Sequence, residues 1–400
     1  MTTAALASSA LAVPHSRIRE LAELAMQMDL SAKAESDKVL RLYFGESNVA
    51  TPEFIKRAAQ KAMADGFTFY TSNAGLMSTR EALARYYAEQ QLVTLDPASH
   101  IVVTTSGVQA LNVAIRCVLN PGDEAIVLTP AWPNGSAIVQ MANAVVKQIP
   151  QPLVGGRYEI DFDAIEAAIT GRTRLLLYTS PSNPLGWVAT DADQDRLLAL
   201  SRKHGLWLMA DEVYDRLYYG AQQLGAPVPS ILRKAAEDDA VIVVQSFSKT
   251  WCMTGWRVGW LISRPDLCAR ATQLNEFIVS HAPSFAQRAG ETALLWGETA
   301  LREMLTQLKQ NRDFCLQALR AMPGLTVPAP EGAFYLFPRV EGLTDSFAFC
   351  KQLLLDTKLG LAPGVAFGAG GEGSIRICYA SEMAILQQAM QRLGDFLRHR

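Results

Sequence analysis

The 400-residue sequence lacks both the long apolar run of a membrane protein and the charge excess of a nucleic-acid-binding protein. No stretch approaches the roughly 18 consecutive apolar residues that a membrane-spanning helix needs. The 37 Lys and Arg residues nearly balance the 39 Asp and Glu residues, so the net charge is only -2, with both signs dispersed along the chain. We therefore expect neither a membrane partner nor a nucleic-acid partner, and small molecules are the expected ligands.

Paired cysteines and a targeting segment are also missing. The six cysteines are scattered without the spacing of a disulfide framework or a zinc site, which indicates free thiols in a reducing compartment. The first 13 residues are rich in Ala and Ser but lack the basic start and the sustained apolar core of a secretory signal. The sequence predicts a cytoplasmic protein without a metal site.

The middle of the chain alternates short apolar strands with amphipathic helices. This alternation is typical of an α/β domain in which helices cover a mostly parallel sheet. The expected strands are residues 101–105, 124–128, 144–148, 175–179, 206–210, 241–245 and 258–262.

The pattern changes near residue 285. Residues 284–322 read as continuously helical, and short strands at 325–327, 334–337 and 374–379 follow with two more helices. This order of helices and strands is typical of a smaller α+β unit. The predicted division is therefore a large domain at 49–285 and a small domain at 286–400, with the segment 1–48 packing with the small domain.

The most informative motif surrounds Lys249, directly after the strand 241–245. Ser246 and Ser248 precede the lysine, and Arg257 follows eight residues after it. Ligands of open α/β sheets bind at the carboxyl ends of strands. A lysine there can form an imine with a carbonyl, while hydroxyls and an arginine can bind phosphate oxygens. An isolated lysine is normally a solvated surface charge, but this combination favours a phosphorylated aldehyde cofactor.

A carboxylate and a phenol follow the neighbouring strand 206–210. Asp211 can face a heterocyclic nitrogen and keep it protonated, and Tyr214 can donate to an oxygen on the same ring. The alternative for Asp211 is an ordinary helix N-cap or turn residue. Its position at a strand end, like that of Lys249, favours function.

Two other strand ends carry weaker signals. Ser106, Gly107 and Val108 join a strand to a helix, so their backbone amides can form a phosphate cradle, although a Ser-Gly pair can also be a simple cap. Trp132 can stack on a planar ring, and it fits equally well as a half-buried core residue.

Asn183 and Arg376 are candidate substrate contacts. Asn183 lies in the turn Pro181–Gly186, which directs its amide above the sheet if the turn is more than structural. Arg376 stands between two isoleucines on an expected strand and faces the opposite side from them. It is either a solvent-facing charge or a fork for a carboxylate.

Together these motifs resemble the class I aminotransferases, which are pyridoxal 5'-phosphate enzymes of fold type I. The resemblance runs in order from about Gly45 to Arg376. Its further matching segments are Gly45-Glu46-Ser47, Thr51-Pro52, Tyr70-Thr71, Ala74-Gly75, Arg80-Glu81-Ala82 and Gly332-Ala333-Phe334-Tyr335. The implied fold is a large mostly parallel α/β domain with a smaller α+β domain.

The resemblance implies a role for each candidate. Lys249 corresponds to the lysine that forms the internal aldimine and then moves a proton between the substrate α-carbon and the cofactor C4′. Asp211 corresponds to the partner of the pyridine nitrogen, and Asn183 and Tyr214 correspond to the donors to the ring 3′-oxygen. The residues matching the phosphate pocket are Ser106, Gly107, Val108, Ser246, Ser248 and Arg257.

The remaining implied roles concern the ring, the substrate and a second subunit. Trp132 takes the position of the aromatic residue that stacks on the ring. Arg376, helped by Gly45 and Asn183, corresponds to the clamp on the substrate α-carboxylate. The tyrosine matching Tyr70 reaches the phosphate of the neighbouring subunit in the family, which implies a homodimer with shared active sites.

The implied reaction is a ping-pong transfer of the amino group of an L-amino acid to a 2-oxo acid, either 2-oxoglutarate or pyruvate. Dicarboxylate-specific relatives use an extra basic residue, and around residues 70–91 the only cations are Arg80, part of the general family pattern, and Arg85. His281 is the only candidate cation in 278–283, and Ser47-Asn48 replaces the commoner Pro-Asp. We expect a neutral, aromatic or broad range of donors, with aspartate left open.

Other reactions use the same kind of site. A carbon-sulfur β-lyase and a cyclopropane-carboxylate-synthase-like eliminase are the enzymatic alternatives. A ligand sensor without catalysis is disfavoured because Lys249, Asp211 and Arg376 are all present. The approximately 45 residues before the first motif are also fewer than the roughly 50 of a small DNA-binding domain.

Overall fold

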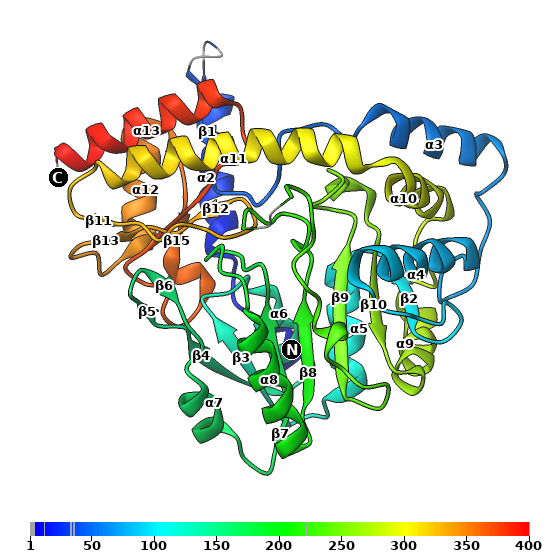
Figure 1. The fold of residues 1–400 in the computed structure, drawn as a ribbon. Coiled ribbons are helices and arrows are strands. Elements are labelled where there is room, and N and C mark those ends of the chain that lie inside the picture. Colours follow the sequence, from blue (N-terminus) through cyan, green and yellow to red (C-terminus); the bar gives the residue numbers. More distant parts are fainter. Residues whose placement is uncertain (1–4, 12, 33, 35–36, 221–222, 400) are drawn as a thin grey trace.

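A seven-stranded sheet forms the centre of the structure, a computed structural model that describes residues 5–11, 13–32, 34, 37–220 and 223–399 (Figure 1). Only β10 runs antiparallel to its neighbours, and the other strand pairs are parallel. The predicted α/β class with a mostly parallel sheet is confirmed. The strand order is β2 (Ile101–Thr104), β10 (Gly259–Ser263), β9 (Val241–Ser246), β8 (Trp207–Asp211), β7 (Thr173–Thr179), β3 (Glu124–Thr129) and β4 (Val145–Pro150).

Both faces of this sheet are buried, which explains why its strands are continuously apolar. Ile242 and Val244 belong to one hydrophobic cluster, whereas Val241 and Val243 belong to the other. Helices cover each face. The first cluster includes residues of α5 (Gly107–Val118), α6 (Asn134–Met141) and α9 (Pro265–Ile278). The second includes residues of α4 (Met77–Gln91), α7 (Phe162–Ala168), α8 (Asp191–His204) and α10 (Ser284–Trp296).

The expected continuous helix at 284–322 is in fact two helices, and this part of the prediction was wrong. α10 ends at Trp296, and α11 (Glu298–Arg320) begins after Gly297. A Cβ at Gly297 would lie 2.6 Å from the Trp251 indole nitrogen, so the indole packs against the chain at this point. The hydrophobic pattern continues across the break, which is why periodicity alone did not show it.

The rest of the chain forms a smaller α+β part beside the sheet. Figure 1 shows the long α11 (yellow) running from α10 toward α12 (Ser346–Thr357) and α13 (Met383–Arg398). A three-stranded sheet has the order β12 (Tyr335–Leu336), β16 (Ile375–Cys378) and β15 (Ala362–Pro363). Two-stranded pairs are formed by β11 (Leu325–Thr326) with β13 (Arg339–Val340), and by β5 (Leu153–Val154) with β6 (Arg157–Tyr158).

Two of the amino-terminal elements lie on this smaller part. β1 (Leu40–Arg41) pairs in parallel with β14 (Leu359–Gly360), and α2 (Arg17–Leu30) packs against α12 and β15. The short α1 (Ser8–Leu11) lies near α6, while α3 (Glu53–Ala64) packs against α10. The domain boundaries at residues 48 and 285 stay predictions.

All six cysteines are free, and four of them are buried. Among the described residues, no helix combines the length and the apolar character needed to cross a membrane.

Candidate active site

The carboxyl ends of four strands meet at one edge of the sheet. Asp211, the last residue of β8, pairs with Thr179 of β7 and with Val244 of β9. At the end of β9, Ser246 lies opposite Gly259 of β10, which in turn lies opposite the last residue of β2. The loops that carry Lys249, Asp211 and Ser106 therefore emerge side by side. Register thus brings together candidates that are far apart in sequence.

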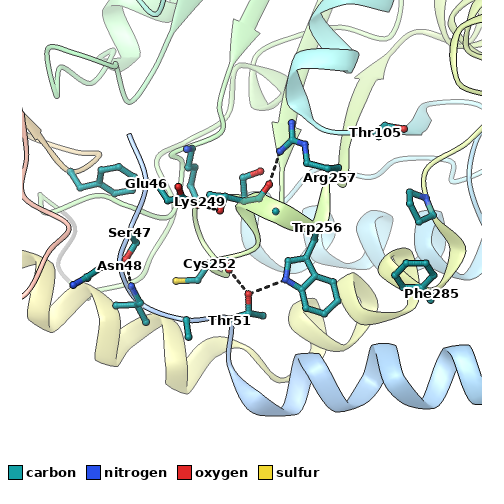
Figure 2. A pocket seen from close by; sticks show the side chains of 17 residues that line it. Glu46, Ser47, Asn48, Thr51, Thr105, Lys249, Cys252, Trp256, Arg257 and Phe285 are labelled. Carbon is teal, nitrogen blue, oxygen red and sulfur yellow. Dashed lines mark hydrogen bonds between the residues drawn. The ribbon is translucent and has the colours of Figure 1, made fainter. Parts of the chain in front are cut away.

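A cavity of about 780 Å³ opens beside Lys249. The segment 46–51 forms one wall and the loop 248–257 another (Figure 2). Thr51 ties the two walls together, since its hydroxyl donates to the Cys252 carbonyl at 2.5 Å and accepts from Trp256 Nε1 at 3.0 Å. The cavity is large enough to hold a small cofactor together with a substrate.

Lys249 is half-buried, and its Nζ donates to the Gly45 carbonyl oxygen at 2.7 Å. Burial lowers the pKa of the amine to about 8, and the nearby charges of Arg376 and Arg257 also lower it. About a tenth of the amine is therefore unprotonated at pH 7, far more than for an ordinary lysine. An unprotonated amine can attack an aldehyde and can accept a proton.

Asp211 is a buried carboxyl group that accepts few hydrogen bonds from the protein. Its Oδ1 accepts a hydrogen bond from the Val213 amide at 3.3 Å. Burial raises the pKa of Asp211 to about 7, although that hydrogen bond and the charge of Lys249 oppose the shift. A cationic ring nitrogen beside this group would stabilise its ionised form.

Tyr214 makes a contact that sequence reasoning did not foresee. It is buried, and its hydroxyl lies 2.7 Å from the hydroxyl of Tyr335 on β12. Tyr335 belongs to the segment Gly332–Tyr335, which matched the family pattern without an assigned role. The only sequence signal for it was that match.

Arg376 is buried on β16, which excludes the solvent-facing interpretation of its charge. Its Nη1 donates to Asn183 Oδ1 at 3.0 Å, and its Nη2 donates to the Tyr43 carbonyl oxygen. The Nε hydrogen has no partner within the described part of the chain. The guanidinium is thus held in place and retains a free donor, as a carboxylate clamp requires.

The expected phosphate-binding residues surround the start of α5. Ser106 is the N-cap of α5, and a Cβ added at Gly107 would lie 3.6 Å from the Ser246 side chain. Ser246 Oγ accepts from the Ser248 amide at 3.3 Å. Arg257 lines the cavity and donates to the Thr254 carbonyl at 2.6 Å. A helix N-terminus, hydroxyls and an arginine together suit a phosphate dianion.

Thr105 was missed among these residues. Its Oγ1 is buried without a hydrogen-bond partner in the described chain, and the residue lines the cavity. Its position between β2 and the predicted Ser106 is the signal that could have found it.

Of the predicted site residues, Ser248, Lys249 and Arg257 line this cavity, and the others lie outside its lining. The side chain of Val108 packs against a core cluster, so only its backbone amide can face a ligand, and Trp132 is half-buried against the same cluster. Tyr70 is 91% exposed, and its ring meets the His281 ring edge-on at 5.7 Å between centroids. Tyr70 therefore makes no contact with Lys249 within one chain.

Comparison with known protein families shows which family combines such a lysine, carboxyl group and arginine. The model of the family described as aminotransferase class I and II matches residues 37–393. The chain belongs to this family. The resemblance inferred from the motifs is thereby confirmed, and the protein is a transferase of the aminotransferase type.

Relatives within the family carry several substrate names. An aspartate aminotransferase of Thermotoga maritima is 32% identical over 378 residues, which are 94% of this chain and 96% of the relative. The solved structure of an aromatic aminotransferase from Pyrococcus horikoshii has a TM-score of 0.86 at 30% identity, covering 96% of this chain and 99% of that one. That of an alanine aminotransferase from Pyrococcus furiosus has a TM-score of 0.91 at 26% identity, covering 99% and 100%.

Members of this aminotransferase family use pyridoxal phosphate, and the residues present suit that group. Buried donors without internal partners, Thr105 Oγ1 and Arg376 Nε, lie where anionic groups of cofactor and substrate are expected. The amine of Lys249 and the carboxyl of Asp211 lie at the same edge of the sheet. One molecule that carries both an aldehyde and a ring nitrogen could therefore contact the amine with the first and the carboxyl with the second. The donor set therefore fits a phosphorylated pyridine aldehyde.

Proposed function

We propose that this protein is a pyridoxal-phosphate-dependent aminotransferase that moves the amino group of an L-amino acid to a 2-oxo acid by a ping-pong reaction. The observation that carries the proposal is the partly buried amine of Lys249, with a pKa lowered to about 8, on the same edge as the carboxyl of Asp211. When bound, pyridoxal phosphate would supply an electron sink for the charge that develops on the substrate α-carbon.

Each residue has a definite task in this proposal. Lys249 would hold the cofactor aldehyde and would move the proton between the substrate α-carbon and cofactor C4′. Asp211 holds the ring nitrogen in its protonated form. Asn183 accepts from Arg376 through Oδ1, so its Nδ2 hydrogens remain to donate to the ring 3′-oxygen with the hydroxyl of Tyr214. Trp132 stacks on the ring.

The phosphate is held by donors from two loops. Ser106 with the amides of Gly107 and Val108 supplies one side, at the positive end of the α5 dipole. The other side is formed by Ser246, Ser248 and Arg257. A phosphate anchored in this way would keep the cofactor in place independently of its bond to Lys249.

Arg376 binds the substrate α-carboxylate, with Gly45 and Asn183 beside it. For the side chain, we propose neutral or aromatic donors and either 2-oxoglutarate or pyruvate as acceptor. Among the described residues that line the cavity, Lys249 and Arg257 are the cations, and both already have tasks toward the cofactor. Phe285 and Phe334 add apolar surface, while the aspartate aminotransferases among the relatives keep aspartate in the test panel.

We further infer a homodimer with shared active sites. Tyr70 is 91% exposed beside Phe69, which is 80% exposed, and near His281, which follows the exposed Phe277 at 86%. A group of exposed aromatic residues is typical of a surface that a partner covers. From there Tyr70 would reach the phosphate of the other subunit. We place the enzyme in the cytoplasm, where its six free thiols stay reduced.

Borohydride reduction of the cofactor-loaded protein, followed by peptide mapping, tests the site. The adduct should map to Lys249, and a Lys309→Ala variant, which changes an exposed lysine on α11, should give the same adduct. Lys249→Ala should lose turnover by several orders of magnitude because the group that bonds the cofactor is also the base. An adduct on another residue, or near-normal rates in Lys249→Ala, would refute the assignment.

A donor and acceptor panel on the purified protein tests the reaction. We expect amino-group transfer from aromatic or neutral amino acids to outpace every elimination. If cysteine-type substrates give pyruvate and ammonia faster than any transfer, the protein is a lyase and not an aminotransferase.

A further inference from the structure

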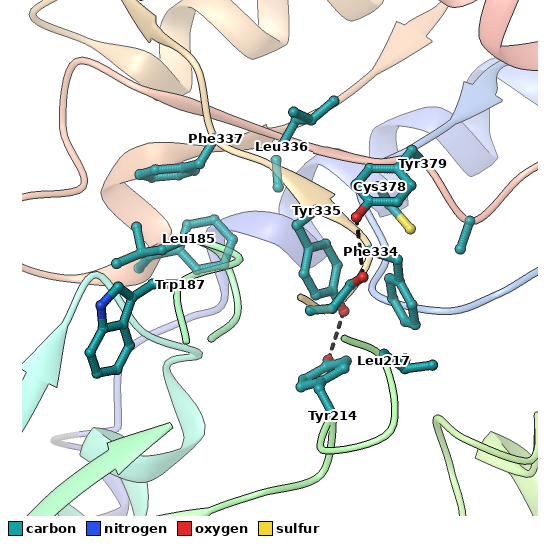
Figure 3. Packing of buried hydrophobic residues seen from close by; sticks show 14 of the residues in the cluster. Leu185, Trp187, Tyr214, Leu217, Phe334, Tyr335, Leu336, Phe337, Cys378 and Tyr379 are labelled. Carbon is teal, nitrogen blue, oxygen red and sulfur yellow. Dashed lines mark hydrogen bonds between the residues drawn. The ribbon is translucent and has the colours of Figure 1, made fainter. Parts of the chain in front are cut away.

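Tyr335 contacts three parts of the candidate site although no role was assigned to it. It is fully buried on β12, and its hydroxyl lies 2.7 Å from that of Tyr214 (Figure 3). The guanidinium carbon of Arg376 lies 4.7 Å from the centre of the Tyr335 ring. A Cβ added at Gly45 would lie only 2.3 Å from the Tyr335 oxygen, so the hydroxyl sits directly against this backbone. One side chain thus adjoins the ring-oxygen donor, the carboxylate clamp and the substrate-side loop.

The direction of the hydrogen bond between the two hydroxyls decides what Tyr214 can do. A phenol has one hydrogen to donate. If Tyr214 donates to Tyr335, it has no hydrogen left for a ring oxygen. If Tyr335 donates to Tyr214, the hydrogen of Tyr214 stays free to point into the site.

The surroundings of the two hydroxyls favour donation by Tyr335. Buried hydroxyls are nearly always hydrogen-bonded, and Tyr214 is the one partner that the structure gives to the Tyr335 hydroxyl within the described residues. Tyr214 can meet the same requirement with a ligand.

We propose that Tyr335 is a positioning residue that donates to the Tyr214 hydroxyl and so reserves the Tyr214 hydrogen for the 3′-oxygen of the cofactor. The inference rests on the proposed function, because it requires pyridoxal phosphate in this site. The ring of Tyr335 also supports the Arg376 guanidinium through its face. Tyr335 thereby acts on both cofactor and substrate without touching the reacting atoms.

A pH titration of the cofactor absorbance in the loaded enzyme tests the direction of this bond. A donor to the 3′-oxygen stabilises its anionic form and lowers the pKa of the chromophore. Tyr335→Phe removes one oxygen atom and makes Tyr214 a weaker donor, so the midpoint should rise. A net hydrogen bond corresponds to about a threefold to tenfold change in the equilibrium, or about half a pH unit to one pH unit. Tyr214→Phe should raise the midpoint further.

The double variant shows whether Tyr335 acts through Tyr214. In the Tyr214→Phe background, adding Tyr335→Phe should leave the midpoint unchanged, since the acceptor is already gone. Tyr379→Phe is the matched control. Tyr379 is also fully buried, and its hydroxyl pairs with that of Tyr219 at 3.1 Å and with the Ala333 carbonyl at 3.1 Å. Its removal should not move the midpoint.

The ring of Tyr335 has a separate readout. Tyr335→Leu removes the surface under Arg376, so it should raise the KM for the amino acid several-fold more than Tyr335→Phe does. Equal KM values in the two variants would refute the support of Arg376.

The outcomes separate this inference from the proposed function. A downward shift in Tyr335→Phe would mean that Tyr214 had been donating to Tyr335, and no shift would mean that the bond is irrelevant to the cofactor. Either result, with a normal wild-type titration, overturns the role of Tyr335 alone. A wild-type protein that binds no pyridoxal phosphate refutes the proposed function, and the role of Tyr335 falls with it.

Discussion

Glu212 offers a quantitative test of the electrostatics beneath the site. It follows Asp211, is 5% exposed, and accepts a hydrogen bond from the Ile231 amide at 3.0 Å. Burial is the main reason that the pKa of Glu212 rises from 4.5 to about 8, and repulsion from Asp215 and Asp211 adds to the rise. The folded protein therefore keeps Glu212 protonated at neutral pH, whereas the unfolded chain ionises it.

The sign and size of the stability change follow from this difference. Between pH 4.5 and 8 the unfolded state has lost the proton that the folded state retains, so the free energy of unfolding falls as the pH rises. The stabilising contribution is complete below pH 4.5 and is lost by pH 8. At 1.36 kcal/mol per pKa unit, the loss from this one group amounts to about 5 kcal/mol. Because the glutamine side chain of the variant does not titrate, Glu212→Gln should not show this loss of unfolding free energy.

The assay is urea unfolding of cofactor-free wild type and Glu212→Gln at several pH values and one protein concentration. The stability of the variant relative to wild type should increase steadily from pH 5 to pH 8. Buried acids far from Glu212 titrate in both proteins and cancel in the difference, whereas Asp211 and Asp215 interact with Glu212 and belong to the effect. Parallel pH profiles of the two proteins would refute the reasoning.

Glu124 provides a matched control of opposite sign. It is 1% exposed, and hydrogen bonds from Lys147, Thr170 and Arg172 lower its pKa to about 2. Its contribution is present above pH 4.5 and is lost as the pH falls toward 2. Glu124→Gln should therefore change the acid limb of the profile and leave the slope between pH 5 and pH 8 as in wild type.

Two further substitutions test the substrate side. Arg376→Lys should lower kcat/KM about 10- to 100-fold, mainly through KM, because a lysine cannot keep the bond to Asn183 and also present a fork to a carboxylate; an unchanged KM would refute the clamp. Gly45→Ala should destabilise the protein by about 1–3 kcal/mol in urea unfolding, because its Cβ would lie 2.3 Å from the Tyr335 oxygen. Gly171→Ala, where a Cβ meets nothing within 4 Å, should cost far less, and equal losses would contradict the overlap.

The sheet and its chemical edge could be predicted because their signals are local. The β-branched run 241–244 is apolar on both faces because both faces are buried, and Ser248 and Lys249, which line the cavity, follow shortly after it. Polar groups directly after such strands must lie at one edge once the strands are parallel. Asp211 and Lys249 were therefore both placed at strand ends without knowledge of the strand order.

The long-range contacts could not be predicted in this way. The Tyr43 carbonyl accepts from Arg376 across more than 300 residues, and a backbone carbonyl carries no sequence signal. Tyr335 and Tyr214 are 121 residues apart and meet only in the folded chain. The close approach of the Trp251 indole to Gly297, at the break between α10 and α11, is another such contact. Each of these features is set by tertiary packing rather than by local pattern.

These long-range bonds have a consequence for function. The cofactor candidates Lys249 and Asp211 stand on the large sheet, whereas Arg376 and Tyr335 stand on the small one. Two hydrogen bonds connect the residues of the small sheet to those of the large one. Arg376 bonds to Asn183, and Tyr335 bonds to Tyr214. Asn183 and Tyr214, at which these bridges end, are the proposed donors to the ring oxygen. A shift of the small sheet relative to the large one would strain these bridges. Substrate carboxylate binding and the protonation of the cofactor should therefore be coupled, so that a carboxylate ligand alone changes the cofactor absorbance.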